Sequence, residues 1–126
     1  MRVAIIGSRS AINSDYKILK KYIPANTSEI VSGGAKGIDS LAKRYALENS
    51  LMYKEFLPNY EDQSLNDKKM APLIRNKLIV DYSDFVLAFW DGISRGTAYT
   101  IDYCIRKYKP VRVYILSKER EKVWKR

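Results

Sequence analysis

Hydrophobic and polar residues follow each other along the chain in two kinds of block. Short apolar or alternating runs predict β-strands at residues 1–6, 29–31, 52–56, 85–90 and 111–116. The segments between them carry apolar residues at helical spacing. The clearest segment starts at Ile38, and the apolar residues that follow it at i+3, i+4, i+7 and i+8 are Leu41, Ala42, Tyr45 and Ala46. This order predicts a protein in which strands and helices alternate.

Start and stop signals predict three further helices. The first follows the capping residues 13–15 and ends before Pro24. The third begins at Pro72, after a polar loop over 58–70 that is long enough to form a flap or to face a ligand. The fourth ends before Pro110, and its apolar face is predicted to consist of Thr97, Ile101, Cys104, Ile105 and Tyr108.

The polarity of the predicted strands sets their order in the sheet. Residues 3–6 and 85–90 are continuous apolar runs, as expected for strands covered on both faces, whereas 52–56 and 111–116 carry charges, as edge strands can. The predicted fold is therefore α/β, a Rossmann-like, doubly wound parallel sheet of five strands in the order 3-2-1-4-5 with helices on both faces. Ligands bind such sheets at the topological switch, here between the first and fourth strands.

Composition narrows the classes of function. The chain has 126 residues, of which 46% are hydrophobic and 29% charged, as in a globular protein. It contains no histidine, which excludes Ser-His-Asp and Cys-His nucleophile pairs and zinc sites built on imidazole. Cys104 is the only cysteine, so there is no internal disulfide or multi-cysteine metal cluster. Catalysis would depend on carboxylates, hydroxyls, lysines or a metal carried by the substrate.

The chain is also strongly basic. Its formal net charge is +9, from 23 Lys and Arg against 14 Asp and Glu. This balance favours phosphorylated or polyanionic partners, with solubility alone as the alternative explanation. Residues 1–116 are predicted to form a single domain and residues 117–126 a basic tail, with five basic and two acidic residues. Because the apolar runs are short, we expect a cytoplasmic protein that does not contact a membrane.

Three loops that contain glycine follow strands whose carboxyl ends meet at the predicted switch. They are GSR at 7–9, SGGAKGID at 32–39 and DGISRGT at 91–97. The second and third lead directly into helices, so unpaired backbone N–H groups would face the crevice. Glycine there would let the backbone approach phosphate or ribose oxygens. The three loops together predict a phosphate site, although each alone is more typical of a tight turn.

The side chains of these loops have two interpretations each. Arg9 is predicted to clamp a phosphate, with a surface ion pair as the alternative. Ser32 and Ser94 would donate to phosphate or cap helices. Asp39 would hold a ribose hydroxyl or complement the dipole of its own helix.

Further candidates lie near the same edge. Arg75 and Asn76, at the start of the third helix, would point along the ligand edge or into solvent. Trp90 would stack on a base or belong to the core. Asp91 and Asp102 are the acids in or beside the third loop, and neither has a partner at a spacing that indicates a reaction.

Four sequence blocks together resemble a known superfamily. They are GSR, SGGAKGID, RNKLIVDYSD and FWDGISRGTAYTI. The set is similar to the SLOG superfamily, the Rossmann-like group that includes the DNA-processing protein DprA (Smf) and the LOG phosphoribohydrolases, and most of all to its small stand-alone YspA-like branch. The resemblance covers nearly the whole of 1–116. It implies a nucleotide or nucleotide-derived ligand held by Gly7, Ser8, Arg9, Gly33, Gly34, Gly37, Asp39, Arg75, Asn76, Ser94, Gly96 and Thr97.

Two departures from the superfamily bear on function. LOG enzymes use a glutamate for N-glycosidic cleavage, and the corresponding position here is Thr100, which argues against a phosphoribohydrolase. DprA-like proteins usually have a histidine in the second helix, in the region where Lys43 lies here. No residue is therefore assigned a catalytic role, and DNA binding stays open.

Three functions follow from these observations. The first is binding of a nucleotide or nucleotide-derived ligand, as a sensor or module. The alternatives are DprA-like single-stranded DNA binding, favoured by the charge and the ten tyrosines, and a nucleotide or N-glycosidic hydrolase that relies on Asp39, Asp91 or Asp102. No cofactor or protein-bound metal is expected beyond the nucleotide and a divalent metal on its phosphates. A homodimer is compatible with the resemblance, because exposed helices beside the ligand edge commonly pair in this group.

Overall fold

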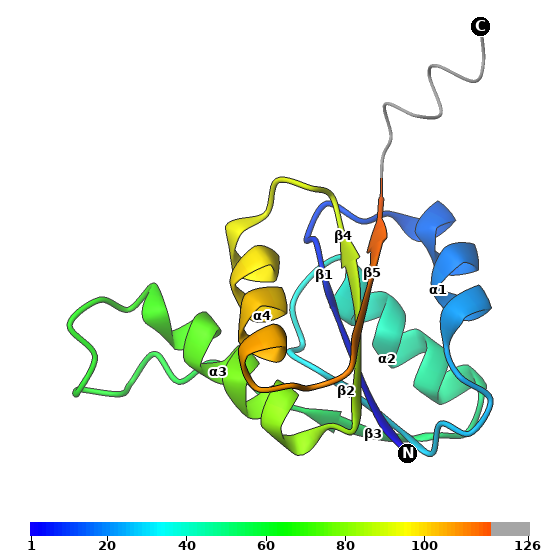
Figure 1. Ribbon diagram of the computed structural model, residues 1–126, viewed down its shortest axis with the longest axis horizontal. Coiled ribbons are helices and arrows are strands. Elements are labelled where there is room, and N and C mark those ends of the chain that lie inside the picture. The colour runs from blue at the N-terminus through cyan, green and yellow to red at the C-terminus, as the bar shows by residue number, and fades with distance from the viewer. Residues whose placement is uncertain (117–126) are drawn as a thin grey trace, which may run out of the picture.

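The computed structural model describes residues 1–116, a five-stranded parallel sheet with helices on both faces (Figure 1). The strands are β1 (Arg2–Gly7), β2 (Glu29–Ser32), β3 (Met52–Glu55), β4 (Phe85–Trp90) and β5 (Val111–Ile115). The helices are the 3-10 turn η1 (Asn13–Asp15), α1 (Tyr16–Tyr22), α2 (Ile38–Glu48), α3 (Met70–Tyr82) and α4 (Arg95–Arg106). The sheet order is β3-β2-β1-β4-β5, so the predicted fold and strand order are confirmed. The predicted basic tail, 117–126, lies outside the described residues.

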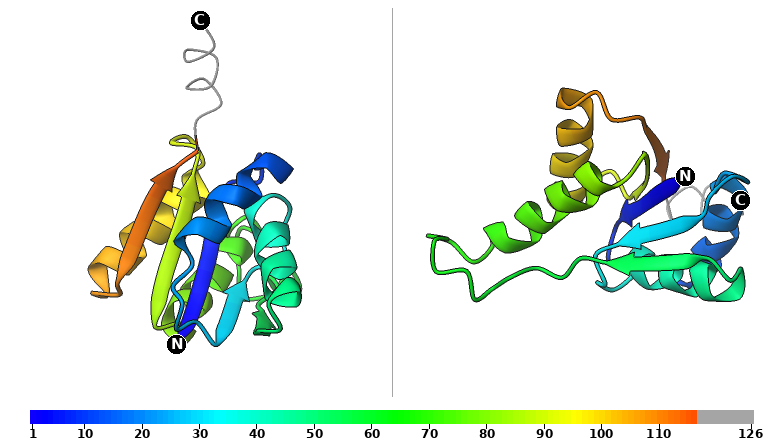
Figure 2. Two further views of the ribbon diagram at one scale, coloured as in Figure 1. Left: turned by 90° about the vertical axis from the view of Figure 1, so that its right-hand side faces the viewer. Right: turned by 90° about the horizontal axis from the view of Figure 1, so that it is seen from below.

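Two hydrophobic clusters lie on opposite faces of the sheet. Ile5 of β1 packs with Leu19 and Ile38 under α1 and α2, and Ile6 packs with Ile79 under α3 and α4 (Figures 1 and 2). Successive residues of a strand point to opposite faces, so the apolar run of β1 supplies both clusters. The edge strands differ from it as predicted, because β3 and β5 carry the exposed charges Lys54 and Arg112.

Helix α3 starts earlier than predicted, at Met70 instead of Pro72. The first N–H groups of a helix have no intrahelical partner, so proline is tolerated throughout the first turn and marks the start only approximately. The segment before α3 extends away from the sheet together with the beginning of that helix (Figures 1 and 2). It does not fold back over the sheet as the predicted flap would.

Helix α4 is displaced from its prediction at both ends. It begins at Arg95, after the N-cap residue Ser94, and ends at Arg106. Tyr108 has a φ of 56° and is 93% exposed, so its predicted place on the apolar face of the helix is wrong. The left-handed backbone at Tyr108 turns the chain into β5. Within residues 1–116, no helix has the length and apolarity needed to cross a membrane.

Candidate functional site

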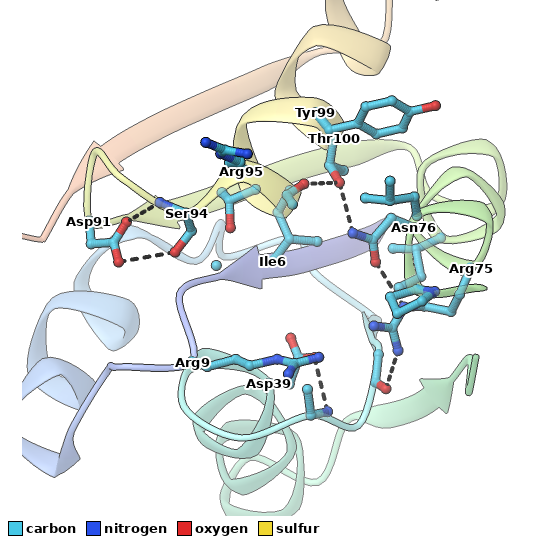
Figure 3. A pocket seen from close by; sticks show the side chains of 18 of the residues that line it. Ile6, Arg9, Asp39, Arg75, Asn76, Asp91, Ser94, Arg95, Tyr99 and Thr100 are labelled. Carbon is cyan, nitrogen blue, oxygen red and sulfur yellow. Dashed lines mark hydrogen bonds between the residues drawn. The ribbon is translucent and has the colours of Figure 1, made fainter. Parts of the chain in front are cut away.

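A pocket of about 720 Å³ opens at the carboxyl ends of β1 and β4 and continues between α3 and α4 (Figure 3). This is the predicted switch point. The residues that line it include most of the predicted set, namely Gly7, Arg9, Gly33, Asp39, Arg75, Asn76, Asp91, Ser94, Gly96 and Thr97. The loops after β1, β2 and β4 therefore converge on one concavity. Four predicted residues, Ser8, Ser32, Gly34 and Gly37, do not line it.

Ser8 joins the converging loops and has no ligand-facing surface. Its N–H donates to the Phe89 carbonyl oxygen over 3.1 Å, and its own carbonyl oxygen accepts from the Ile38 N–H over 3.3 Å. Its Oγ accepts from the Asp91 N–H over 2.9 Å. Ser8 is buried, so these bonds account for its polar groups without a ligand. One residue thus fixes the exit of β1, the start of α2 and the exit of β4 relative to one another.

Gly7, Gly33 and Gly37 have protein atoms where the sequence predicted a ligand. A Cβ at Gly7 would lie 2.2 Å from the Phe89 carbonyl oxygen, and one at Gly33 would lie 2.5 Å from Nη1 of Arg75. A Cβ at Gly37 would lie 2.4 Å from the Ser8 carbonyl oxygen. These glycines allow the loops to pack against each other, which is a reason for glycine that does not depend on a ligand.

Gly96 is different from these three. No heavy atom lies within 4 Å of a Cβ built there, and the residue lies in the first turn of α4 on the wall of the pocket. Packing therefore gives no reason for glycine at this position. Close approach of a ligand to the amides of α4 does give one.

Ser32 and Gly34 face away from the pocket, towards β3. Ser32 is fully buried, and its Oγ lies 2.6 Å from the Tyr53 hydroxyl. A Cβ at Gly34 would lie 2.6 Å from the Glu55 carboxyl carbon, and its φ is +69°. The Tyr53 hydroxyl also donates to Oε1 of Glu55 over 2.8 Å. These two residues thus take part in packing between β2 and β3, and their predicted ligand contact is not part of this pocket.

Asp39 is a buried carboxylate beside two arginines. It is 9% exposed, and its Oδ2 accepts from the Ala35 N–H over 3.0 Å. Burial raises the pKa of Asp39, while the Ala35 N–H and the charges of Arg75 and Arg9 oppose the rise. Arg9 itself is exposed and lies next to Asp39 in Figure 3. The group offers a free cation to an anion and an acceptor to a hydroxyl or amino group.

Arg75 and Asn76 lie on the pocket wall, as the first of their two interpretations predicted, and both are held by hydrogen bonds within the protein. Nη1 of Arg75 donates to the carbonyl oxygens of Gly33 and Phe56, and its Nε donates to Oδ1 of Asn76 over 2.8 Å. Nδ2 of Asn76 donates to Oγ1 of Thr100 over 2.8 Å. Burial lowers the pKa of Arg75. This chain of bonds connects α4 to α3 and α3 to the glycine loop after β2.

Asp91 and Ser94 shape the start of α4. Oδ1 of Asp91 accepts from the N–H groups of Ile93 and Ser94, both over 2.8 Å. Its Oδ2 accepts from the hydroxyls of Ser94 over 3.0 Å and Ser10 over 3.4 Å. Burial acts to raise the pKa of Asp91, but these hydrogen bonds outweigh it, and the pKa is lowered. Trp90 donates Nε1 to the Ser94 carbonyl oxygen and does not line the pocket.

Sequence reasoning missed part of the lining. Lys69 and Arg95 are exposed cations on the wall, and Tyr99 is 37% exposed beside them. Arg95 lies within one of the quoted loops and could have been included on that ground. Lys69 could not, because its position depends on where α3 starts. Within residues 1–116, no group of three or more His, Cys, Asp or Glu side chains could hold a metal ion.

Fold and site define a Rossmann-like protein with a cation-bearing pocket at the topological switch. The family model described as DNA recombination-mediator protein A matches residues 1–62, which run from β1 to beyond β3. No curated protein shows significant sequence similarity to the chain. The family match covers just under half of the chain, and together with the shared fold it agrees with the predicted resemblance to the DprA-like SLOG superfamily. Its assignment to the YspA-like branch stays a prediction.

Two solved structures share the fold. DNA processing protein A (DprA) from Streptococcus pneumoniae has a TM-score of 0.76 and 22% identity, over 93% of this chain and 51% of that one. DNA processing protein A from Helicobacter pylori, whose single-stranded DNA binding mode has been described structurally, has a TM-score of 0.69 and 23% identity, over 90% of this chain and 64% of that one. The chain thus spans between half and two thirds of these proteins. At such identities the likeness shows the fold.

Proposed function

We propose that this chain binds single-stranded DNA and seats one nucleotide of the strand in the pocket at the switch point. The observation that carries the proposal is the set of three exposed cations, Arg9, Lys69 and Arg95, around one concavity. Cations neutralise phosphodiester charge, and the amides in the first turn of a helix donate to phosphate oxygens. The net charge of +9 acts in the same direction by attracting a polyanion.

The arrangement of the lining suits a nucleotide within a strand. Arg9 reaches the pocket from the exit of β1, and Arg95 reaches it from α4 (Figure 3). Between α3 and α4 the wall includes the apolar side chains of Leu73 and Ile79. Such a wall takes a sugar or base, while the cations hold the phosphate.

The comparisons support DNA over the free nucleotide that the sequence analysis placed first. The matching family model describes a DNA recombination mediator, and the Helicobacter pylori relative in fold is a single-stranded DNA binding protein. The first description concerns DNA recombination and the second concerns single-stranded DNA, and neither concerns a nucleotide sensor.

Replacing Arg9 by alanine tests the proposal. Arg9→Ala is expected to lower the affinity for a labelled oligothymidylate about tenfold and to reduce the slope of log affinity against log salt by about one, because one phosphate contact is lost. Fluorescence anisotropy between about 50 and 200 mM salt measures both quantities. The matched control is Arg106→Ala, because Arg106 is an exposed arginine that pairs with Asp102 over 2.8 Å and does not line the pocket. Equal losses in the two variants, or a wild-type protein that binds no oligomer, would contradict the proposal.

A free nucleotide in the same pocket is the second candidate function. The volume of about 720 Å³ favours it, because it lies in the range of small-molecule sites. A mononucleotide that raises the melting temperature of a protein unable to bind oligomers would establish this function instead. A LOG-type hydrolase has less support, because the Thr100 hydroxyl is buried and donates to the Gly96 carbonyl oxygen over 2.9 Å.

A further inference from the structure

Helix α1 leaves part of its face of the sheet uncovered. It has seven residues and ends at Tyr22. Figure 2, left, shows β5 and the lower half of β4 with no helix in front of them. A hollow of about 380 Å³ lies here, lined among others by Lys21, Tyr22, Phe85, Arg112 and Tyr114. We call it the β4–β5 hollow.

A stack of aromatic rings forms one wall of the β4–β5 hollow. The rings of Tyr22 and Tyr114 are stacked with centroids 3.9 Å apart, and those of Tyr114 and Phe89 with centroids 5.4 Å apart. Phe89 is fully buried, whereas Tyr22 and Tyr114 are partly exposed. The exposed rings are therefore anchored in the core, so binding a flat ligand to them requires little additional ordering.

The charges of the β4–β5 hollow have one sign. Lys21 and Arg112 are exposed, and no acidic residue is among the described residues that line the hollow. An inward-pointing charge on an edge strand can by itself protect that edge from pairing, which would account for Arg112. It does not account for Lys21, which comes from α1. Two cations from separate elements beside aromatic rings form the combination that binds single-stranded nucleic acid, with bases on the rings and phosphates on the cations.

We propose that the β4–β5 hollow is a second contact for the same single strand that occupies the pocket, an inference that rests on the proposed function. The two sites lie on opposite faces of the sheet, because the pocket extends under α3 and α4 and the hollow lies on the side of α1. The sheet therefore separates them, although the hollow reaches along β4 from Phe85 to Leu87 and along β5 to Tyr114, which pairs with Phe89. One nucleotide therefore cannot touch both sites, and only a longer strand engages the hollow.

The test compares oligothymidylates of about 4 and about 16 nucleotides, which bracket the usual site sizes of single-strand binding domains. The variant is the double substitution Lys21→Glu with Arg112→Glu. We expect it to lower the affinity for the longer strand about tenfold and to leave the shorter strand within about twofold of wild type. The matched control is Arg106→Glu with Lys107→Glu, which makes the same change of charge at exposed residues that line neither cavity. It is expected to lower the affinity for the longer strand far less. Thermal melting verifies that both variants are folded.

Each outcome bears on one of the two proposals. If both double variants lose affinity for the longer strand equally, or if neither loses any, the proposal of a second contact is overturned. If Lys21→Glu with Arg112→Glu lowers the affinity for the longer strand and Arg9→Ala does not, the strand contacts the hollow, and the proposed role of the pocket is overturned. A bromouracil-substituted strand gives independent evidence, because photo-crosslinks to Tyr22 or Tyr114 support the hollow. Crosslinks confined to Tyr99 of the pocket speak against it.

Discussion

At the scale of single residues, Gly96 brings the backbone of the first turn of α4 to the wall of the pocket without a side chain. A methyl group there meets no protein atom within 4 Å. We therefore expect Gly96→Ala to leave the free energy of unfolding unchanged or to raise it by about 0.5 kcal/mol, because alanine favours the helix. Because Gly96 lines the pocket, the same methyl is expected to lower DNA affinity. Urea unfolding and anisotropy measure the two effects.

Gly37→Ala is the matched control for this prediction. Gly37 has a φ of +73°, and its Cβ would lie 2.4 Å from the Ser8 carbonyl oxygen. Its replacement should lower the free energy of unfolding by about 2 kcal/mol or more. A Gly96→Ala protein that binds DNA as well as wild type would show that the ligand does not approach the first turn of α4.

Asp39 makes stability and binding depend on pH. Its folded-state pKa is raised by burial, so its contribution to stability is fully present below the unfolded-state pKa and is lost as the pH rises through the folded-state pKa. Asp39→Asn keeps an acceptor for the Ala35 N–H and is never ionised. We expect the free energy of unfolding of this variant to equal that of wild type at acidic pH and to exceed it at neutral pH. Chemical denaturation between about pH 4 and 8 measures both.

The same residue should govern the pH dependence of DNA binding. An ionised Asp39 places a negative charge beside Arg9 and opposes a phosphate. Wild-type affinity is therefore expected to rise as the pH falls, and the affinity of Asp39→Asn to change less. If Asp39→Asn were less stable than wild type at neutral pH, the attraction of the Asp39 carboxylate to Arg9 and Arg75 would outweigh the cost of burying its charge.

At the scale of elements, Arg75 connects α3 to the glycine loop that follows β2. Its guanidinium donates to the carbonyl oxygens of Gly33 and Phe56, so Arg75→Met leaves both acceptors without this partner. We expect a loss of about 1 to 3 kcal/mol in the free energy of unfolding. Hydrogen exchange should also accelerate in the loop after β2.

Lys77→Met is the control for this prediction on the same helix. Lys77 is partly exposed and lies over the rings of Tyr99 and Tyr103 at 5.6 Å from each centroid. Its replacement removes a cation without freeing a buried acceptor, so the loop after β2 should exchange at its wild-type rate. If Arg75→Met changed the exchange rate of this loop no more than Lys77→Met does, the hydrogen bonds of Arg75 would not be what holds the loop in place.

At the scale of the whole molecule, the fold could be predicted because it depends on properties that each segment carries by itself. The apolar runs 3–6 and 85–90 had to be central, and the charged runs containing Lys54 and Arg112 had to be edges. The convergence of three loops followed from strand order alone. The ends of α3 and α4 were less accurate, because Pro72 and Thr97 are compatible with more than one position in a first turn.

The roles of individual site residues could not be predicted in the same way. Whether Gly37 makes room for a ligand or for Ser8 depends on which backbone passes beside it, and that is a property of the tertiary structure. Arg75 appeared free because the carbonyl groups that it binds, at Gly33 and Phe56, lie far away in the sequence. The β4–β5 hollow exists because α1 ends before it covers the sheet, which the sequence of α1 does not reveal.

The bonds by which Ser8 joins β1, β4 and α2 have a kinetic consequence. Because one buried residue holds the exits of β1 and β4 and the start of α2, these segments need no rearrangement when a strand arrives. The speed of capture is then set by the basic surface as a whole, which few single replacements alter. The lifetime of the complex is set inside the pocket. Under the proposed function, replacements inside the pocket would therefore change how long the protein holds a DNA strand and leave the rate at which it finds one almost unchanged.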